Sequence, residues 1–449
     1  MSLHLRRAAV LAAGLSVAVS ATIGTPVRAA EAAPAAPAGK SDRAPARVSA
    51  SWLSGELTRG LIHNTEFDFD DYGLSIDTAL GLDAVGKAGK VDRIAKAVAA
   101  QVASYTTGAD FDSTDVYAGA TAKAAVLALV ADRKPSDFGG VDLIAQLESL
   151  VGTSGRIADK SEFGDFSNVV GQSYAAWSLS EASSPRAKAV VSYLLEQQCG
   201  PGYFRLGFNT DPDASDQSCV GAPASDRAAD TDATAIATLA LREIKPTTRI
   251  TRAIKRSTRW LVETQRDNGG FGGGTTTSKP NTNSTGLAGW VLAEAGRKDP
   301  AARAAAFVRR HQAVSAGSCA GKLAGEAGAI AYDAKAFRAG VSKGITKASS
   351  DQWRRASAQA LPVLLAAPAA SGRLVVTGRA ASGKVRLGLA GVAPGERVCV
   401  TGPGVEKAVV GGGEATRVAF DLPRTRAASA TYTVVNAAGE TAKVVVGLP

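Results

Sequence analysis

Histidine and cysteine are scarce in this sequence, and their scarcity excludes several kinds of site. The 449 residues include three histidines and four cysteines, and one histidine, His4, lies in an N-terminal segment expected to be removed. The other two, His63 and His311, are too few for a multi-histidine metal site and disfavour a histidine-based catalytic triad. Beyond residue 30 no run approaches the roughly 20 apolar residues that a membrane-spanning helix needs. The sequence therefore predicts no transmembrane segment.

The excess of positive charge is spread along the chain. The formal net charge is +10, and loss of Arg6, Arg7 and Arg28 with the N-terminal segment would lower it to +7. Nucleic-acid binding usually needs a polybasic tail or stripe, and the sequence has neither. We expect a soluble chain that binds no nucleic acid.

The first residues have the pattern of an export signal. Arg6 and Arg7 precede an apolar stretch over residues 8–23 that ends in a small-residue cleavage pattern. We expect a signal peptide over residues 1–29 and then a flexible linker, rich in alanine and proline, over residues 30–50. The mature protein is expected to be secreted, extracellular and monomeric.

A helical region with an internal repeat follows over residues 51–368. Its small-residue helices alternate with more charged ones, and a self-comparison finds one motif at a fixed spacing. The motif contains a glutamine, a glycine four residues later and an aromatic residue two further on. The glutamine can satisfy free backbone groups at a helix end, and the glycine permits the turn that folds the aromatic residue back. The two clearest copies are Tyr193-Leu194-x-x-x-Gln198-x-x-x-Gly202-x-Phe204 and Trp260-Leu261-x-x-x-Gln265-x-x-x-Gly269-x-Phe271.

These two motifs resemble the Gln-Trp repeats of the terpenoid cyclase and protein prenyltransferase superfamily, with Phe204 and Phe271 where that family prefers tryptophan. The resemblance covers about residues 52–337 and implies an all-α fold, the α/α toroid of two concentric helix rings. Toroids of this kind serve catalysis, ligand binding and covalent tethering alike, so the resemblance indicates a fold more than an activity.

The period of the sequence changes to two near Gly372. Alternation such as Val385-x-Leu387-x-Leu389 is typical of strands with one buried face, and some seven short runs are separated by Gly, Pro and Asn turns. We expect a small β-sandwich of immunoglobulin-like type over residues 371–449.

The connections of the helical region fall into short and long ones. Inner and outer helices alternate along the chain, so all connections that lead into inner helices lie on one rim of the ring. Long loops are often functional. We therefore expect the working face on the rim that carries the long loops, which are residues 62–72, 106–116, 153–168, 199–229 and 266–283.

Four cysteines in an exported chain favour disulfides over zinc. Cys199 and Cys219 bracket the longest of these loops, so we expect a bridge between them. Whether Cys319 and Cys399 pair or stay free is left open.

Several acids are candidates for function. Asp68-x-Asp70-Asp71 has the D-x-D-D spacing that class II terpene cyclases of the resembling family use for proton donation, although acids before a helix commonly cap it. An aromatic content of 6% is thin for stabilising carbocations. With Asp77 and Asp232, near the starts of inner helices, these residues form our predicted ligand-binding set.

Two aspartate-rich segments share one spacing. Both could bring carboxylates to a calcium ion, but Asx turns and helix caps explain them as well, and neither has the glycine and terminal glutamate of an EF-hand loop. We predict no cofactor and keep calcium as the weaker alternative. The residues are Asp110, Asp112, Asp115, Asp211, Asp213 and Asp216.

The favoured hypothesis is a non-catalytic protein that binds a small molecule or a cell-envelope component on the concave rim. The alternative is a terpenoid cyclase-like or prenyltransferase-like enzyme that acts on an isoprenoid through the acids near Asp70 and Asp71. Aromatic residues of the inner helices, Tyr174, Trp177 and Trp290, are interpreted as core rather than pocket wall. A deep, aromatic-lined hole with an isolated buried aspartate would favour the enzyme.

Overall fold

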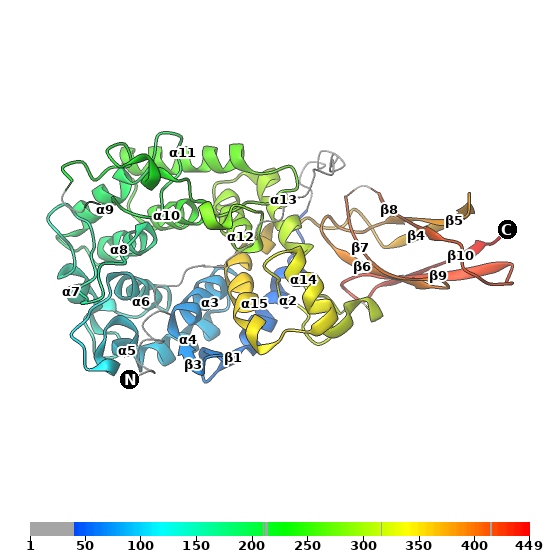
Figure 1. The fold of residues 1–449 in the computed structure, drawn as a ribbon, viewed down its shortest axis with the longest axis horizontal. Helices are drawn as coiled ribbons and strands as arrows, with labels where there is room; N and C mark the ends of the chain where they lie inside the picture. The colour runs from blue at the N-terminus through cyan, green and yellow to red at the C-terminus, as the bar shows by residue number, and fades with distance from the viewer. Residues whose placement is uncertain (1–39, 210, 212–213, 316, 414) are drawn as a thin grey trace.

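The computed structural model describes residues 40–449 except 210, 212–213, 316 and 414. The expected signal peptide, residues 1–29, lies outside the described residues. Within the described part, no helix is both long and apolar enough to cross a membrane. Helices occupy the described chain up to Ala366, and a separate all-β region follows from Val375 (Figure 1).

Six helices form a closed ring in which each packs against the next in chain order and the last returns to the first. Figure 1 shows them around a common centre. Small residues dominate these helices, which are buried on nearly every side because neighbours pack on both flanks. The six are α3 (Tyr72–Ala84), α6 (Ala118–Val130), α8 (Val169–Glu181), α10 (Thr231–Glu243), α12 (Thr282–Glu294) and α15 (Lys347–Ala360).

A second set of helices packs outside the ring, each against the ring helix that precedes it. These helices are amphipathic: in α11, Ile250, Ala253, Ser257 and Leu261 recur every three or four residues and are buried, and the opposite face is charged. The set is α4 (Ala88–Ala99), α7 (Leu143–Glu148), α9 (Ala187–Glu196), α11 (Thr248–Thr264) and α13 (Lys298–Arg309).

Shorter elements complete the helical part. A small antiparallel sheet, β1 (Leu57–Thr58), β2 (Leu61–Asn64) and β3 (Phe69–Asp71), leads into α3. The remaining α-helices are α2 (Ala44–Gly55), α5 (Val102–Thr106) and α14 (Ala334–Lys343). The 3-10 helices are η1 (Ala109–Phe111), η2 (Pro135–Asp137), η3 (Ala224–Arg227), η4 (Thr275–Thr277), η5 (Ser318–Leu323) and η6 (Pro362–Ala366).

The start of α2 differs from the sequence expectation. The helix begins at Ala44, inside the segment 30–50 that the composition assigned to a flexible linker. Its alanines favour a helix, Pro45 fits the first turn, and Ala46, Ala50 and Leu53 are buried in the core. Burial of one apolar face therefore orders the end of a segment whose composition alone predicts a tether.

The repeat motif forms the glutamine-bonded turn expected from the sequence, which we call the clasp. Gln198 Nε2 donates to Gly202 O at 3.0 Å and to Ala253 O of the next outer helix at 2.9 Å. Gln265 Nε2 donates in the same way to Gly269 O at 3.0 Å and to Pro300 O at 2.9 Å. Each glutamine thus joins a loop to the following outer helix.

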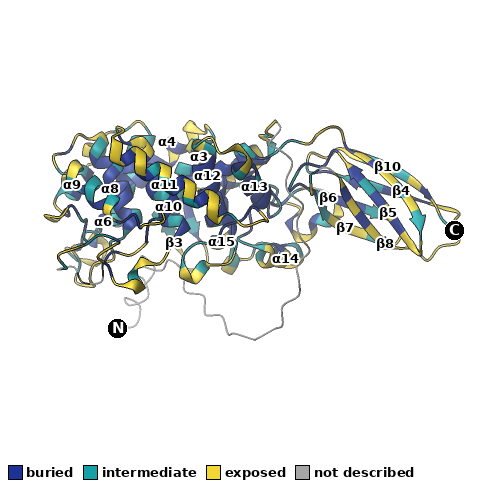
Figure 2. Ribbon diagram, turned by 90° about the horizontal axis from the view of Figure 1, so that it is seen from above, coloured by how far each residue is buried: buried dark blue, intermediate teal, exposed yellow. Residues whose placement is uncertain are grey.

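The β region consists of two antiparallel sheets in the orders β10-β9-β6-β7 and β4-β5-β8. Alternate residues such as Val385, Leu387 and Leu389 are buried between them, with Tyr432 and Val434 on the facing strand (Figure 2). The strands are β4 (Val375–Ala381), β5 (Lys384–Ala390), β6 (Arg397–Gly402), β7 (Val405–Val410), β8 (Thr416–Asp421), β9 (Ser429–Val435) and β10 (Thr441–Gly447).

Two disulfides are present. Cys199 and Cys219 are bridged, with Cα atoms 5.2 Å apart, and this confirms the pairing expected from the sequence. Cys319 of η5 and Cys399 of β6 are also bridged, with Cα atoms 5.5 Å apart. The second bridge, which the sequence left open, links the helical part covalently to the β region.

Candidate ligand-binding site on the axis of the helical ring

A cavity of about 350 Å³ lies inside the ring of six helices. Its walls come from the C-terminal halves of the inner helices and are mostly apolar. Exposed charged residues, Asp83, Arg242, Glu243 and Glu294, line it where these helices end. The apolar and aromatic wall residues include Leu80, Tyr174, Trp177, Ile236, Leu239, Leu287 and Trp290.

The wall follows from helical periodicity. On α10 the residues that face the axis, Asp232, Ile236, Leu239 and Glu243, recur every three or four positions. The positions between the first three are buried small residues: Ala233, Thr234, Ala235, Ala237 and Thr238. The sequence interpretation of Trp177 and Trp290 as core was wrong, since both line the cavity.

Ion pairs occupy the axis toward the long-loop end of the ring. Lys123 of α6 lies 2.6 Å from Asp77 of α3, and its Nζ also donates to Gly73 O at 2.9 Å. Arg355 of α15 pairs with Asp71 at 2.6 Å. The cavity is lined by the C-terminal halves of the ring helices, so it lies toward the rim opposite the one that the sequence predicted as the working face.

Asp232 of α10 has no cationic partner among the described residues. It sits one helical turn from Ile236 on the same face of α10, and its Oδ1 is buried without a hydrogen bond from the described residues. Burial raises the pKa of Asp232 to about 7, and the negative charge of nearby Asp230 adds to this shift. The carboxyl group is therefore about half protonated near neutral pH.

A phenol also faces the cavity. Burial raises the pKa of Tyr174 well above its ordinary value, and the charge of Asp77 adds to the shift. The hydroxyl therefore stays protonated and can donate a hydrogen bond beside the aromatic wall.

The acids of the D-x-D-D segment lie outside this cavity. The Asp68 side chain is 96% exposed, and Asp70 accepts a hydrogen bond from, or pairs with, His63 Nδ1 at 2.9 Å. Asp71 caps α3, accepting from Leu74 N at 2.7 Å. Of the five acids in the predicted ligand-binding set, only Asp77 lines the cavity, and Asp232 lies one turn beyond it.

The acids of the first calcium candidate segment make separate contacts. Asp110 accepts from Ser104 Oγ at 2.9 Å, Asp112 adopts a left-handed conformation with φ 54°, and buried Asp115 accepts from Ser161 Oγ at 2.9 Å.

In the second segment, Asp216 accepts from Ser218 N at 2.9 Å, and Asp213 lies outside the described residues. Asp211 is described, and its backbone N–H donates to Asn209 Oδ1 at 3.0 Å. Over residues 40–449 with their gaps, no group of three or more His, Cys, Asp or Glu side chains is placed to hold a metal ion.

Sequence reasoning missed Lys123 and Arg355, which neutralise axial acids. One signal was available for Lys123: it is the single charged residue in an otherwise small and apolar helix. A lone lysine on such a helix indicates an internal carboxylate, because an unpaired buried ammonium is costly. Arg355 stands in a polar stretch that offers no such contrast.

Comparison with known proteins shows which solved structures have a similar fold. No protein-family model and no curated protein matches the chain. Two solved structures of variants of the type II terpene cyclase MstE from Scytonema, each in complex with geranylgeranyl dihydroxybenzoate, superpose with a TM-score of 0.50. They are 13% and 12% identical and cover 72% of this chain and 95% and 96% of their own. A protein from Actinoplanes, at 15% identity, has a TM-score of 0.48. The chain therefore has a terpene cyclase-like fold.

Proposed function

We propose that this protein binds an apolar, isoprenoid-like small molecule in the axial cavity. The observation that carries the proposal is the cavity itself, which is walled by Trp177, Trp290 and aliphatic side chains at the centre of a helical ring. Concave, mostly apolar sites with a few polar groups are the usual form of small-molecule sites. At about 350 Å³ the cavity suits a ligand at the small end of that class.

The fold supports this choice of ligand. We interpret the closed ring and its outer helices as an α/α toroid over residues 51–368, and the terminal sheets over residues 371–449 as an immunoglobulin-like sandwich. The MstE variants of similar fold hold a geranylgeranyl compound. An isoprenoid is the class of apolar molecule that this likeness favours.

The charges at the mouth predict which isoprenoids bind. Asp83, Glu243 and Glu294 stand there against the single base Arg242, which already pairs with Glu294 at 3.4 Å. A net negative mouth repels anions. We therefore expect a neutral alcohol or hydrocarbon to bind better than a diphosphate.

Binding can be tested by calorimetric titration with geraniol, farnesol, geranylgeraniol and farnesyl diphosphate. Ala84→Trp places an indole in the cavity mouth, and Val262→Trp adds the same group on the outer helix α11 as a matched control. We expect saturable farnesol binding that Ala84→Trp weakens more than about tenfold and Val262→Trp leaves unchanged. Equal binding by both variants would place the ligand elsewhere.

A second candidate function is acid catalysis on a bound isoprenoid, and Asp232 favours it. A carboxyl with a pKa of about 7 and no cationic partner can give its proton to an alkene carbon; the cyclised cation then loses a proton to water, and the carboxylate takes a proton back from water. This replaces Asp70 and Asp71 as the acid of the enzyme hypothesis, since Asp71 caps a helix and pairs with Arg355. Gas chromatography with mass spectrometry should then find a cyclised product that Asp232→Asn, still binding farnesol, does not make.

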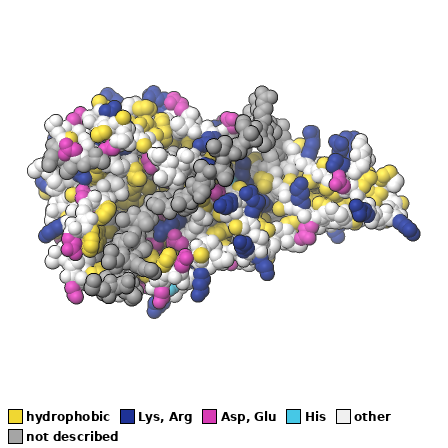
Figure 3. All heavy atoms as spheres, viewed as in Figure 1, with side chains coloured by type: hydrophobic (Ala, Val, Ile, Leu, Met, Phe, Trp, Pro, Cys, Tyr) yellow, Lys and Arg dark blue, Asp and Glu magenta, His cyan; other side chains and the backbone are white. Residues whose placement is uncertain are grey.

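We propose further that the protein is exported and acts as a monomer on a small molecule or a cell-envelope component. Both disulfides support export, because disulfides persist in oxidising compartments. Lys and Arg side chains are scattered over the face seen in Figure 3 and over the β region, which supports the expectation of no nucleic-acid partner. Mass spectrometry of the culture medium should find a chain that begins at Ala30.

A further inference from the structure

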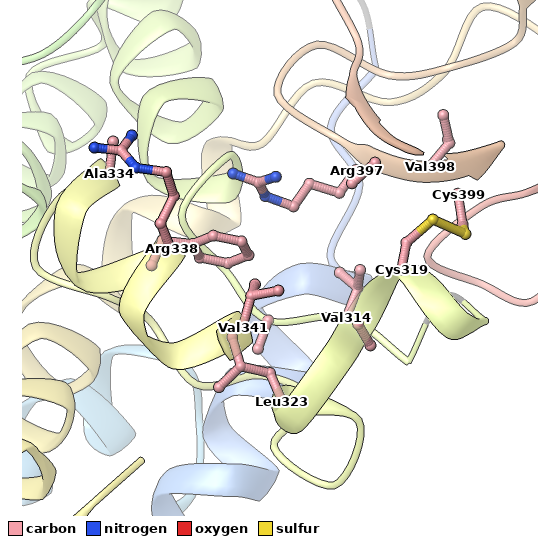
Figure 4. Close-up of a pocket in the computed structure, with 13 residues that line it drawn as sticks. Val314, Cys319, Leu323, Ala334, Arg338, Val341, Arg397, Val398 and Cys399 are labelled. Carbon is pink, nitrogen blue, oxygen red and sulfur yellow. A yellow bond between two sulfur atoms is a disulfide. The ribbon is translucent and has the colours of Figure 1, made fainter. Parts of the chain in front are cut away.

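A second cavity, of about 240 Å³, lies where the helical part meets the β region. Its lining comes from η5, α14 and the residues Ala313 and Val314 before η5 on one side, and from β6 and β7 on the other. The Cys319–Cys399 disulfide is part of this lining and ties the two sides together (Figure 4). The cavity is far along the chain from the axial site and shares no residue with it.

One part of the lining is apolar and another is cationic. Val314, Leu323 and Val341 form an aliphatic patch, and buried Phe337 lies beside it. Arg338 and Arg397 reach the same cavity from α14 and β6, and Figure 4 shows both guanidinium groups on the side away from the aliphatic residues. The cavity is therefore amphipathic, with two positive charges beside an apolar floor.

The Arg397 guanidinium is held in place by the protein. Its Nε donates to the backbone oxygen of Arg310 at 2.6 Å, and its carbon lies 3.8 Å from the centre of the Phe337 ring. Among the described residues, no hydrogen bond is found from its terminal N–H groups. Burial lowers the pKa of Arg397 to about 10, and the charge of Arg310 adds to this shift. The group is thus partly desolvated and repelled by a neighbouring cation.

No carboxylate of the described residues compensates these charges. Neither Arg338 nor Arg397 has an acidic side chain within 4.0 Å among residues 40–449 as described. The acids nearest in sequence have other partners: Glu396 accepts from Ala393 N at 2.9 Å and lies 3.7 Å from Arg309. Asp333 caps α14 through Ala336 N at 2.8 Å. A partly buried Arg397 and an exposed Arg338 on one cavity, without a carboxylate beside them, favour an anion from solution.

We propose that this interdomain cavity binds an amphiphilic organic anion, a medium-length alkyl carboxylate, with its headgroup on Arg397 and Arg338 and its alkyl chain against Val314, Leu323 and Val341. A guanidinium matches a carboxylate in a bidentate geometry, and the aliphatic patch takes the chain out of water. The disulfide fixes the two walls before the ligand arrives, which lowers the entropy cost of binding.

Calorimetric titration of the full-length, oxidised protein tests the site with three probes of matched chemistry. Octanoate carries both headgroup and chain, octan-1-ol carries the chain alone, and acetate carries the headgroup alone. We expect saturable binding of octanoate, with octan-1-ol and acetate each at least about tenfold weaker. Equal affinity for octan-1-ol and octanoate would remove the role of the arginines and overturn the proposal.

Two pairs of variants locate the site. Arg397→Gln removes the charge at the headgroup, and Arg386→Gln removes one from exposed β5 as a control. Ala408→Trp fills the cavity from an exposed position, and Ala419→Trp adds the same ring on exposed β8. We expect each cavity variant to weaken octanoate binding by about tenfold or more and each control to leave it unchanged.

All four positions change exposed or half-exposed residues, so the variants should fold, and near-identical circular dichroism spectra will show whether they do. Octanoate binding that survives both Arg397→Gln and Ala408→Trp would overturn the proposal, as would the absence of saturable binding to the unsubstituted protein. Because the axial cavity is untouched, farnesol binding should be the same in all four variants. A parallel loss of farnesol binding would mean that the octanoate result reports general damage, and Arg338→Gln would then replace Arg397→Gln.

Discussion

The two clear copies of the repeat, residues 193–243 and 260–294, are built alike but differ in side chains that face the axis. In the first copy, Phe204 N donates to Thr234 Oγ1 at 2.8 Å; in the second, Phe271 N donates to Thr285 Oγ1 at 2.9 Å. The caps correspond as well, because Asp230 accepts from Ala233 N at 2.8 Å and Asn281 from Ser284 N at 2.9 Å. Two residues after each cap, the first copy has Asp232 and the second has Asn283.

The comparison distinguishes residues that hold the repeat together from residues that face the axis. The repeated residues hold a loop, an outer helix and an inner helix together, and they do so equally in both copies. The residue that faces the axis is free to differ, because it makes none of those contacts. Asn283 Nδ2 donates to Gln359 Oε1 at 2.8 Å, a bond that Asp232 does not make; the Oδ1 atoms of both residues are buried without a partner among the described residues. The chemistry of the site is thus determined by axis-facing residues that take no part in the contacts of the repeat.

The largest expected effect comes from making the first copy like the second. In Asp232→Asn the buried acid is gone, so its pH dependence should be lost. With a pKa of about 7 in the fold and about 4 unfolded, the carboxyl of the native protein lowers stability as pH rises from about 4 to about 7. At pH 8 the variant should be more stable by up to about 4 kcal/mol, and at pH 4 the difference should vanish.

Urea unfolding at a series of pH values measures this change. Asp267→Asn, at an exposed acid of the second copy, is a control for general loss of a carboxylate. A pH profile of Asp232→Asn parallel to that of the unsubstituted protein would show that the acid is ionised in the fold.

The next largest loss of stability should come from replacing the clasp glycines, and it should be equal in both copies. Gly202 and Gly269 have φ of 119° and 83°, and a Cβ at either would meet the backbone oxygen of Arg256 or Arg303 on the following outer helix. Gly202→Ala and Gly269→Ala should each cost about 3 kcal/mol in urea unfolding, from backbone strain and overpacking. Gly296→Ala, with φ 69° and open space around it, should cost about 1 kcal/mol. Similar costs at all three positions would remove the packing argument.

The disulfide of the first copy has no counterpart in the second. Cys199 and Cys219 close a loop with a sequence separation of 20, and replacing both by serine should lower stability by between about 2 and 3 kcal/mol. Differential scanning calorimetry of the oxidised protein and the double variant gives the change. A melting temperature equal to that of the unsubstituted protein would show that the loop is already held by Arg205 and Gln217.

The smallest expected effect concerns the shared threonines. Thr234→Val and Thr285→Val each leave a buried phenylalanine N–H without its acceptor and should cost about 1 kcal/mol. Thr238→Val removes a hydroxyl that donates to Thr234 O and receives no N–H, so its cost should be smaller. Urea unfolding that gives clearly unequal costs for Thr234→Val and Thr285→Val would break the equivalence of the two copies.

Local pattern was enough to predict much of the fold. The spacing of Gln198, Gly202 and Phe204 predicted the clasp, because its partners lie within one repeat. Two-residue alternation predicted the strands after Gly372, since one buried face suffices to set that period. The Cys199–Cys219 bridge followed from a loop bounded by two cysteines in an exported chain.

The site was harder to predict because it forms across the ring. Asp77 and Lys123 are on different helices, and Asp71 meets Arg355 from the far end of the helical part, so no local spacing brings these pairs together. The same holds for Cys319 and Cys399, because their pairing depends on how the helical part packs against the β region. Asp232 was selected for its place in a helix, but its burial, which sets its protonation, depends on the neighbouring repeat.

Infrared spectroscopy of the carboxylic acid band tests most directly whether Asp232 is a neutral acid at the end of the axial cavity. The difference spectrum between the unsubstituted protein and Asp232→Asn, recorded at about pH 6, isolates this group from the other acids. The structure predicts a protonated carboxyl band that disappears as pH rises through about 7. A difference spectrum at about pH 6 that shows only ionised carboxylate would contradict the account.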